Sequence, residues 1–160
     1  MTLPSQSLSH VLVASDNKRT LHFPVKLLIG KQTIEMTALI DSGATGNFID
    51  LGLLSLANFP LKRMSQPICA FNVDGSLNKR GTIMWKASTR MLLSKEPENI
   101  EFMVVGLGRR QIILGMPWLK TWNPCINWKS HSLALPTLSP TDYDEHILPQ
   151  RYIFTSLARS

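Results

Sequence analysis

Apolar and polar side chains alternate along much of the chain, most regularly near its N-terminus. The alternation runs over Phe23–Ile29 and again over Ile34–Ile40, with Gly30 between the two runs. Side chains that alternate in this way belong to strands with one buried face, and a glycine between two such runs is typical of a tight turn. The pattern predicts a β-hairpin whose second strand ends at Asp41. Pro24 predicts that the first strand lies at a sheet edge near its start, because proline cannot donate a ladder hydrogen bond.

Short elements with turn residues between them follow a loop at residues 41–46, which contains two glycines. Phe48 resumes a strand, and Asp50 is suited to cap a short helix over Leu51–Ala57. Asp74-Gly75 predicts a hairpin turn, and Pro117 fits the first turn of another short helix. The other strands predicted are Ile68–Val73, Thr82–Leu93, Ile100–Val105 and Ile126–Trp128, and Gln111–Leu114 is a short apolar run.

The same pattern divides the chain into three parts. Residues 1–20 are polar and are expected to form a flexible lead-in. Residues 21–135 carry the predicted strands and form one mostly-β domain, either a small barrel or a sandwich with covered edges. Residues 136–160 are rich in proline and show no periodicity, so we interpret them as a connector or disordered tail.

Composition narrows the classes of protein further. The chain has 160 residues, a net charge of +6 and two cysteines, Cys69 and Cys125, which are too few for a disulfide framework. We interpret both as small apolar packing residues, and the four tryptophans as core or edge-packing residues. No apolar run reaches the ~18 residues that a membrane span needs, so no membrane partner is expected. Basic residues occur in pairs beside predicted turns, where solvated side chains are expected, although weak attraction to RNA or to an acidic partner stays open.

Asp41 differs from the other acidic residues in its surroundings. It follows Ala38-Leu39-Ile40 and precedes Ser42-Gly43-Ala44, at the end of an apolar strand that enters a glycine-containing loop. The backbone can bring an acid in that position into a protected cleft. Two carboxyl groups held together in such a cleft ionise in turn, as a pair that activates water requires. The simpler alternative is a capped, solvated loop acid.

A second segment strengthens this interpretation. About 70 residues after Asp41, Gln111-Ile-Ile-Leu-Gly115 supplies the two bulky apolar residues and the glycine that accompany an aspartate loop in pepsin-like folds. Three stretches then match in order and spacing: Ala38–Asp50, Phe71–Gly75 and Ile113–Leu119. The chain resembles the protease domain of a gypsy-type LTR retrotransposon polyprotein, a member of the retropepsin-like aspartic protease family. The resemblance spans about Leu21 to Lys129.

The resemblance implies a retropepsin-like closed β-barrel with one or two short helices and one lobe per chain. It implies that Asp41 is the catalytic residue, with Ser42, Gly43 and Ala44 supporting its loop. Ser42 would hydrogen-bond across a dimer axis, and Gly43 would let the substrate backbone approach. The flap that closes over a peptide would be formed by Val73, Asp74, Gly75 and Ser76. The segment that backs the aspartate loop would be Ile113, Leu114 and Gly115.

A single Asp-Ser-Gly occurs in the chain, so the resemblance implies a homodimer in which each subunit gives one Asp41. The implied activity is that of an aspartic endopeptidase that hydrolyses a retroelement polyprotein, its polypeptide substrate. A water activated between the two carboxyl groups would attack the peptide bond, with no metal and no cofactor. The implied location is intracellular, in the cytoplasm or within a virus-like particle.

Three alternatives stay open from the sequence. The chain could be a catalytically silent retropepsin-like module, left from a retrotransposon, that dimerises or binds peptides. Direct nucleic-acid binding by the basic surface is a weaker alternative. Asp74 is either a plain turn residue or a contact at the flap tip, whereas Asp50 is expected to cap a helix. Thr45 stands where many viral retropepsins have an acid, which bears on specificity.

Overall fold

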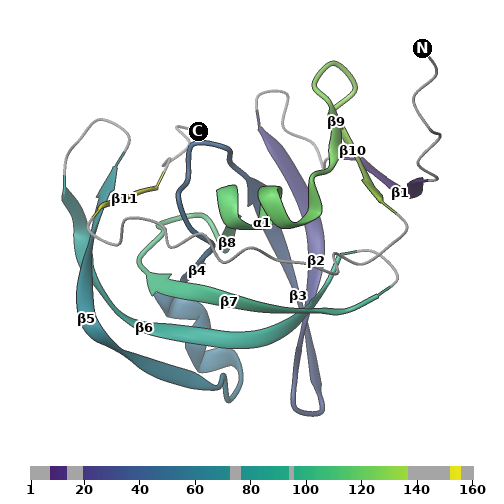
Figure 1. Ribbon diagram of the computed structural model, residues 1–160. Helices are drawn as coiled ribbons and strands as arrows, with labels where there is room; N and C mark the ends of the chain where they lie inside the picture. The colour runs from purple at the N-terminus through teal and green to yellow at the C-terminus, as the bar shows by residue number, and fades with distance from the viewer. Residues whose placement is uncertain (1–7, 14–19, 73–76, 94–95, 137–151, 156–160) are drawn as a thin grey trace.

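A six-stranded β-barrel forms the body of the protein (Figure 1). The computed structural model describes residues 8–13, 20–72, 77–93, 96–136 and 152–155. The barrel strands, in their order around the barrel, are β6 (Leu77–Leu92), β2 (Leu21–Ile29), β3 (Gln32–Ile40), β8 (Ile112–Leu114), β4 (Phe48–Asp50) and β7 (Glu98–Val105). Antiparallel pairing of β6 with β7 closes the barrel. The fold is therefore mostly β, with a closed barrel and two short helices, as the resemblance implies.

Two further groups of strands flank the barrel. The strand β5 (Leu61–Asn72) pairs with β6, and β11 (Tyr152–Thr155) pairs in parallel with β5. A separate sheet has the order β1 (Leu8–Val13), β10 (Ser132–Pro136) and β9 (Cys125–Asn127). The described helices are the 3₁₀-helix η1 (Leu51–Leu56) and the α-helix α1 (Met116–Trp122), and neither is long and apolar enough to cross a membrane.

The hairpin of β2 and β3 follows directly from the alternation of its residues. Phe23, Val25 and Leu27 are buried while the positions between them are more exposed, and the strands pair over their whole length. Gly30 turns the chain with φ of 58°, a left-handed conformation that favours glycine. On its other side β2 pairs with β6 at Lys26–Leu28 alone, so Pro24 does lie at a sheet edge.

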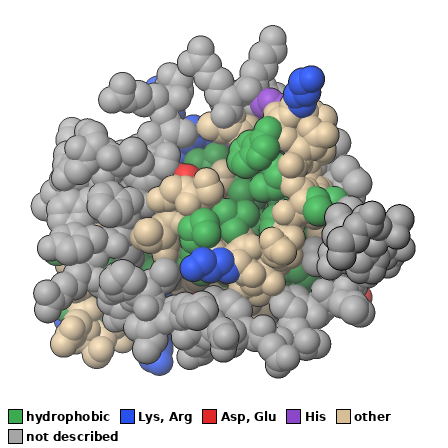
Figure 2. Space-filling model, turned by 45° about the horizontal axis from the view of Figure 1, so that its top comes forward, with side chains coloured by type: hydrophobic (Ala, Val, Ile, Leu, Met, Phe, Trp, Pro, Cys, Tyr) green, Lys and Arg blue, Asp and Glu red, His purple; other side chains and the backbone are tan. Residues whose placement is uncertain are grey.

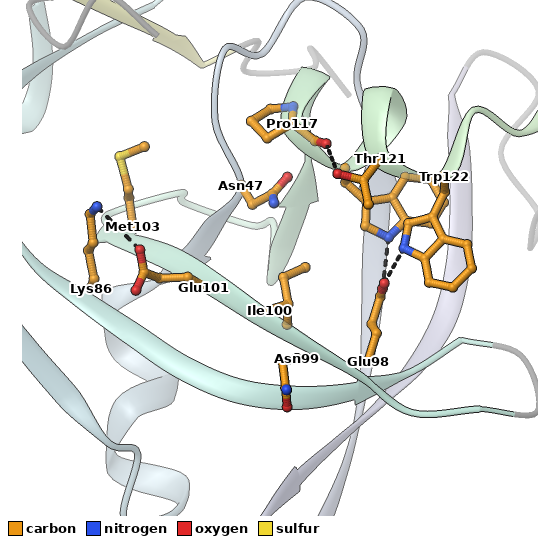
Figure 3. Close-up of a pocket in the computed structure, with 11 residues that line it drawn as sticks. Asn47, Lys86, Glu98, Asn99, Ile100, Glu101, Met103, Pro117, Thr121 and Trp122 are labelled. Atoms are coloured by element: carbon orange, nitrogen blue, oxygen red, sulfur yellow. Dashed lines mark hydrogen bonds and ion pairs between the residues drawn. The ribbon is translucent and has the colours of Figure 1, made fainter. Parts of the chain in front are cut away.

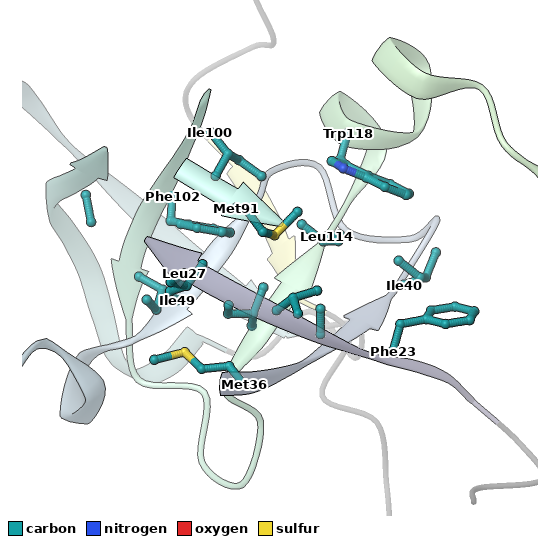
Figure 4. Close-up of a cluster of buried hydrophobic side chains, with 14 of the residues drawn as sticks. Phe23, Leu27, Met36, Ile40, Ile49, Met91, Ile100, Phe102, Leu114 and Trp118 are labelled. Carbon is teal, nitrogen blue, oxygen red and sulfur yellow. The ribbon is translucent and has the colours of Figure 1, made fainter. Parts of the chain in front are cut away.

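The core fills the barrel and extends under α1. Phe23 and Leu27 of β2, Phe102 of β7, Leu114 of β8 and Trp118 of α1 belong to one buried cluster (Figure 4). Ile113 points the other way, into a second buried cluster on the outer side of β8. The strand β8 is therefore buried on both faces, which explains why its sequence is apolar throughout.

Several expectations differ from the structure in detail. The first helix is a 3₁₀-helix, and β5 begins at Leu61, earlier than predicted, because its first half is largely exposed and lacks alternation. The strand β10 lacks a signal strong enough to be predicted. The strands β1 and β11 lie in the segments interpreted as lead-in and tail. The three-part division of the chain stays a prediction.

The interpretation of the cysteines as packing residues was wrong, because both are exposed. Cys69 lies between the buried residues Ile68 and Ala70 of β5, so the alternation of the strand turns its side chain outward. The interpretation of the tryptophans is confirmed for Trp118, which is buried. It is wrong for Trp128, whose side chain is 65% exposed.

Candidate active site

Asp41 lies at the end of β3, where the chain leaves the barrel and enters a loop that leads to β4. The parallel pairing of β3 with β8 brings Ile40 opposite Leu114, so both strands end at the same edge of the barrel. The backbone N–H of Asp41 donates to the carbonyl oxygen of Leu114 at 3.0 Å. This bond fixes the start of the loop to β8, the strand that contains the segment expected to back the loop.

Hydrogen bonds within the loop hold the carboxyl group of Asp41 in place. The N–H of Gly43 donates to Oδ1 of Asp41 at 2.8 Å, and the N–H of Ala44 donates to the carbonyl oxygen of Asp41 at 3.1 Å. A side-chain oxygen that accepts from the backbone two residues further on is a common device of tight turns. One carboxylate oxygen is therefore oriented by the backbone of its own loop, while the side chain of Ser42 lies exposed beside it.

Gly115 allows an unusually close approach between β8 and the loop. A Cβ atom at this position would lie 2.2 Å from the carbonyl oxygen of Gly46 and 2.6 Å from that of Ala44. The N–H of Gly115 donates to Oδ1 of Asn47 at 3.0 Å, and the N–H of Met116 donates to the carbonyl oxygen of Ala44 at 2.8 Å. The segment Ile113–Gly115 therefore lies directly behind the loop of Asp41, and Ala44 is completely buried between them.

Two polar atoms of this loop are buried without a hydrogen-bond partner among the described residues. They are Oδ2 of Asp41 and Oγ1 of Thr45. Buried polar atoms in native proteins almost always have partners, so such an atom calls for a group from elsewhere, such as water, ligand or a second chain. Oδ1 of Asp41 is fixed, and Oδ2 is left to interact with a group that this part of the chain does not supply.

The remaining predicted site residues lie outside the described residues. Val73, Asp74, Gly75 and Ser76 connect β5 to β6, which pair antiparallel as far as Phe71 and Leu77.

Asp50 is a helix cap, as predicted: its Oδ2 accepts from Gly52 at 3.2 Å, and its Oδ1 accepts from the N–H of Leu107 at 2.8 Å. Within the described ranges, no group of three or more histidine, cysteine or acidic residues is placed to hold a metal ion.

Sequence reasoning missed one acidic residue close to this region. Glu98 begins β7 and lines a cavity of about 520 Å³ between β7 and α1, which also reaches Asn47 of the aspartate loop (Figure 3). Burial raises the pKa of Glu98 to about 7, although hydrogen bonds from Trp118 and Trp122 lower it in part. The sequence did contain a sign that Glu98 faces inward. Its spacing from Ile100, Phe102 and Val104 places it on the same, buried face of the strand.

Comparison with one solved structure supports this description of the fold. A retropepsin-like aspartic protease from Rickettsia conorii superimposes with a TM-score of 0.54 at 16% identity, over 84% of this chain and 96% of that one. The retroviral protease-like domain of Ddi1 from Leishmania major gives a TM-score of 0.46 at 19% identity, over 78% and 98% of the two chains. The family model of the PEG10/RTL1 protease domain matches residues 37–139, which include the loop of Asp41 and the segment behind it. The chain therefore belongs to the PEG10/RTL1 protease domain family and has a retropepsin-like fold.

Proposed function

We propose that this chain is an aspartic endopeptidase, active as a homodimer in which a water is held between two Asp41 side chains. The observation that carries the proposal is the state of the Asp41 carboxyl group. Its Oδ1 accepts from Gly43, whereas its Oδ2 is buried and has no partner among the described residues. A second carboxyl group and a water at the same place would satisfy that oxygen.

The proposed mechanism uses the two carboxyl groups in different protonation states. Like charges at close range cannot both ionise easily, so the pair shares one proton. The ionised carboxylate removes a proton from the water, and the protonated group donates a hydrogen bond to the carbonyl oxygen of the peptide bond. The backbone of Gly43 fixes one oxygen of each carboxyl group and so leaves the other oriented toward the reacting atoms.

A dimer is required because the chain contains a single Asp-Ser-Gly. A twofold axis beside the loop would bring the two copies of Asp41 together, and the exposed Ser42 would then donate to the partner's loop. Figure 2 views the molecule with the top of Figure 1 tilted toward the reader. Hydrophobic side chains of the described residues gather on this face. A hydrophobic area of this kind is consistent with a surface that a partner covers.

Two finer features belong to the same proposal. We infer that Val73–Ser76 form the flap over the bound peptide, with Asp74 at or near its tip. The family membership and the matching stretches support an origin in a gypsy-type retroelement, whose polyprotein would be the polypeptide substrate. The close fit of Gly115 against the loop supports a role for Ile113–Gly115 in holding the catalytic loop.

The test is peptide cleavage by the purified protein, from about pH 4 to pH 7, with a mixed peptide pool read by mass spectrometry. The variant Asp41→Asn removes the acid and keeps the shape of the side chain. Its matched control is Glu35→Gln, an exposed acid on the same strand, β3. Cleavage should vanish in the first variant and persist in the second. Cleavage that survives Asp41→Asn contradicts the proposal, and a dimer that cleaves nothing favours the silent dimerisation or peptide-binding module.

A further inference from the structure

Glu98 joins two elements that otherwise face each other across a cavity. Its carboxyl group accepts hydrogen bonds from both tryptophans of α1: Nε1 of Trp118 donates to Oε1 at 2.8 Å, and Nε1 of Trp122 donates to Oε2 (Figure 3). No other side-chain hydrogen bond joins the described residues of α1 to those of β7. One acid therefore ties the helix to the barrel wall.

The other charged groups on the cavity do not compete for this role. Lys86 of β6 and Glu101 of β7 line it and pair with each other at 3.2 Å. The helix contributes uncharged lining residues, and the hydroxyl of Thr121 donates to the carbonyl oxygen of Pro117 within α1 itself. The aspartate loop contributes the amide of Asn47. Among the described residues that line the cavity, Glu98 therefore accepts hydrogen bonds from the two indole N–H groups alone.

The helix in turn holds the aspartate loop. Its first residue, Met116, donates to the carbonyl oxygen of Ala44 at 2.8 Å, and Gly115 just before it donates to Asn47 at 3.0 Å. The helix has seven residues, and helices this short are not stable in water without tertiary contacts. Its position therefore depends on what fixes it: the packing of Trp118, Leu119 and Trp122 against the core and the bonds to Glu98.

We propose that Glu98 is a positioning residue for the active site: it fixes α1 against β7 and thereby sets the place of Gly115 and Met116 behind the loop of Asp41. This inference rests on the proposed function for its effect on catalysis, whereas its structural part stands independently. The side-chain partners of Glu98 among the described residues are Trp118 and Trp122, not Asp41. Glu98 acts through the helix, and its loss should lower turnover more than peptide binding.

The charge of Glu98 matters for this role. An ionised carboxylate accepts strongly from both indoles, whereas a neutral group offers one good acceptor. Burial raises its pKa to about 7, so the ionised form predominates above that pH, at a free-energy cost for its burial. Glu98→Gln reproduces the neutral form at nearly the same shape, because its amide oxygen accepts from one indole and its NH₂ group cannot accept from the other.

The experiment compares Glu98→Gln with the matched control Glu101→Gln, another acid on the same strand and cavity. Amide hydrogen exchange at Gly115 and Met116 reports the position of the helix without requiring activity. At about pH 8, where Glu98 is largely ionised, we expect exchange there to be about tenfold faster in Glu98→Gln and unchanged in the control, which corresponds to the loss of one charge-assisted hydrogen bond. In a cleavage assay at the same pH, kcat should fall about tenfold with KM changed less than about twofold.

The outcomes separate the two proposals. Equal exchange at these amides in Glu98→Gln and wild type overturns the positioning role. If exchange is faster in Glu98→Gln but the wild-type protein cleaves no peptide, the positioning role stands and the proposed function is overturned. If Glu98→Gln does not fold, Trp122→Phe keeps most of the ring and removes one indole N–H. That variant should show the same exchange pattern, and wild-type exchange in it contradicts the proposal.

Discussion

The loop of Asp41 and the junction between α1 and β7 both hold an acid, but they are built in different ways. The loop is held mainly by backbone hydrogen bonds and by a glycine contact with no room for a side chain. The junction is held by side chains that meet beside a cavity, with Glu98 between two indoles. A site built from backbone keeps its geometry at any pH at which the protein folds. A site built around a titratable side chain varies with pH.

The largest effect should come from the acid of the loop. Asp41→Asn should lower the rate of peptide cleavage by about 1,000-fold or more, because the pair loses the group that exchanges a proton with water. The variant should still fold, since the asparagine oxygen can accept from Gly43. Initial rates on one identified peptide, together with circular dichroism, measure both effects. If circular dichroism shows that the variant is unfolded, its loss of activity reflects a structural role of Asp41.

A side chain at Gly115 should cost stability because backbone atoms surround it. Gly115→Ala places a Cβ atom 2.2 Å from the carbonyl oxygen of Gly46, so the loop or the strand must shift. We expect a loss of about 3 kcal/mol in the free energy of unfolding, measured by denaturant titration. Gly30→Ala is the control, because it has open space around it and should lose about 1 kcal/mol from its φ alone.

The acid of the junction should make stability depend on pH. Unfolded Glu98 loses its proton near its ordinary pKa of 4.5, whereas the folded protein keeps it up to about pH 7. Between those values the folded state binds more protons, so the free energy of unfolding falls as pH rises. We expect Glu98 to contribute a decrease of about 2 kcal/mol from pH 4.5 to pH 7, measured by urea titration. In Glu98→Gln that part of the slope should be missing. An equal slope in both proteins would contradict the assignment.

The smallest effect should come from the exposed pair on the same cavity. Lys86 and Glu101 lie 3.2 Å apart, with 29% and 49% of their side chains exposed. Exposed pairs contribute little because water and salt screen them, so a double-mutant cycle of Lys86→Ala and Glu101→Ala should give a coupling of about 0.5 kcal/mol. A coupling well above 1 kcal/mol would mean that this pair, as well as Glu98, stabilises the junction.

The sequence was sufficient for the parts of the molecule that depend on local pattern. Alternation predicted the hairpin of β2 and β3, and the cap of η1 at Asp50 followed from residue type and position. The closed barrel followed from the resemblance, which rests on Asp41 and Gly115 and on their spacing. Family membership supports that resemblance at the level of the protease domain.

The junction could not be predicted because its contacts join residues far apart in the sequence. Glu98 meets Trp118 and Trp122 only after β7 and α1 are placed against each other. The bond from Gly115 to the side chain of Asn47 depends in the same way on tertiary structure. Periodicity places Glu98 on the inner face of its strand, but it does not say which donors lie opposite. The flap residues Val73–Ser76 lie outside the described residues and stay a prediction.

The most direct test of shared catalysis is to mix wild-type protein with the inactive variant. Wild-type protein at a fixed concentration at which it is dimeric is titrated with Asp41→Asn, and the rate of peptide cleavage is followed after the subunits have exchanged. If each site needs one Asp41 from each subunit, a tenfold excess of the variant should lower the rate about tenfold, because most wild-type subunits then pair with an inactive partner. A rate that does not change on mixing, with mixed dimers demonstrated, would contradict a site made of two Asp41 residues.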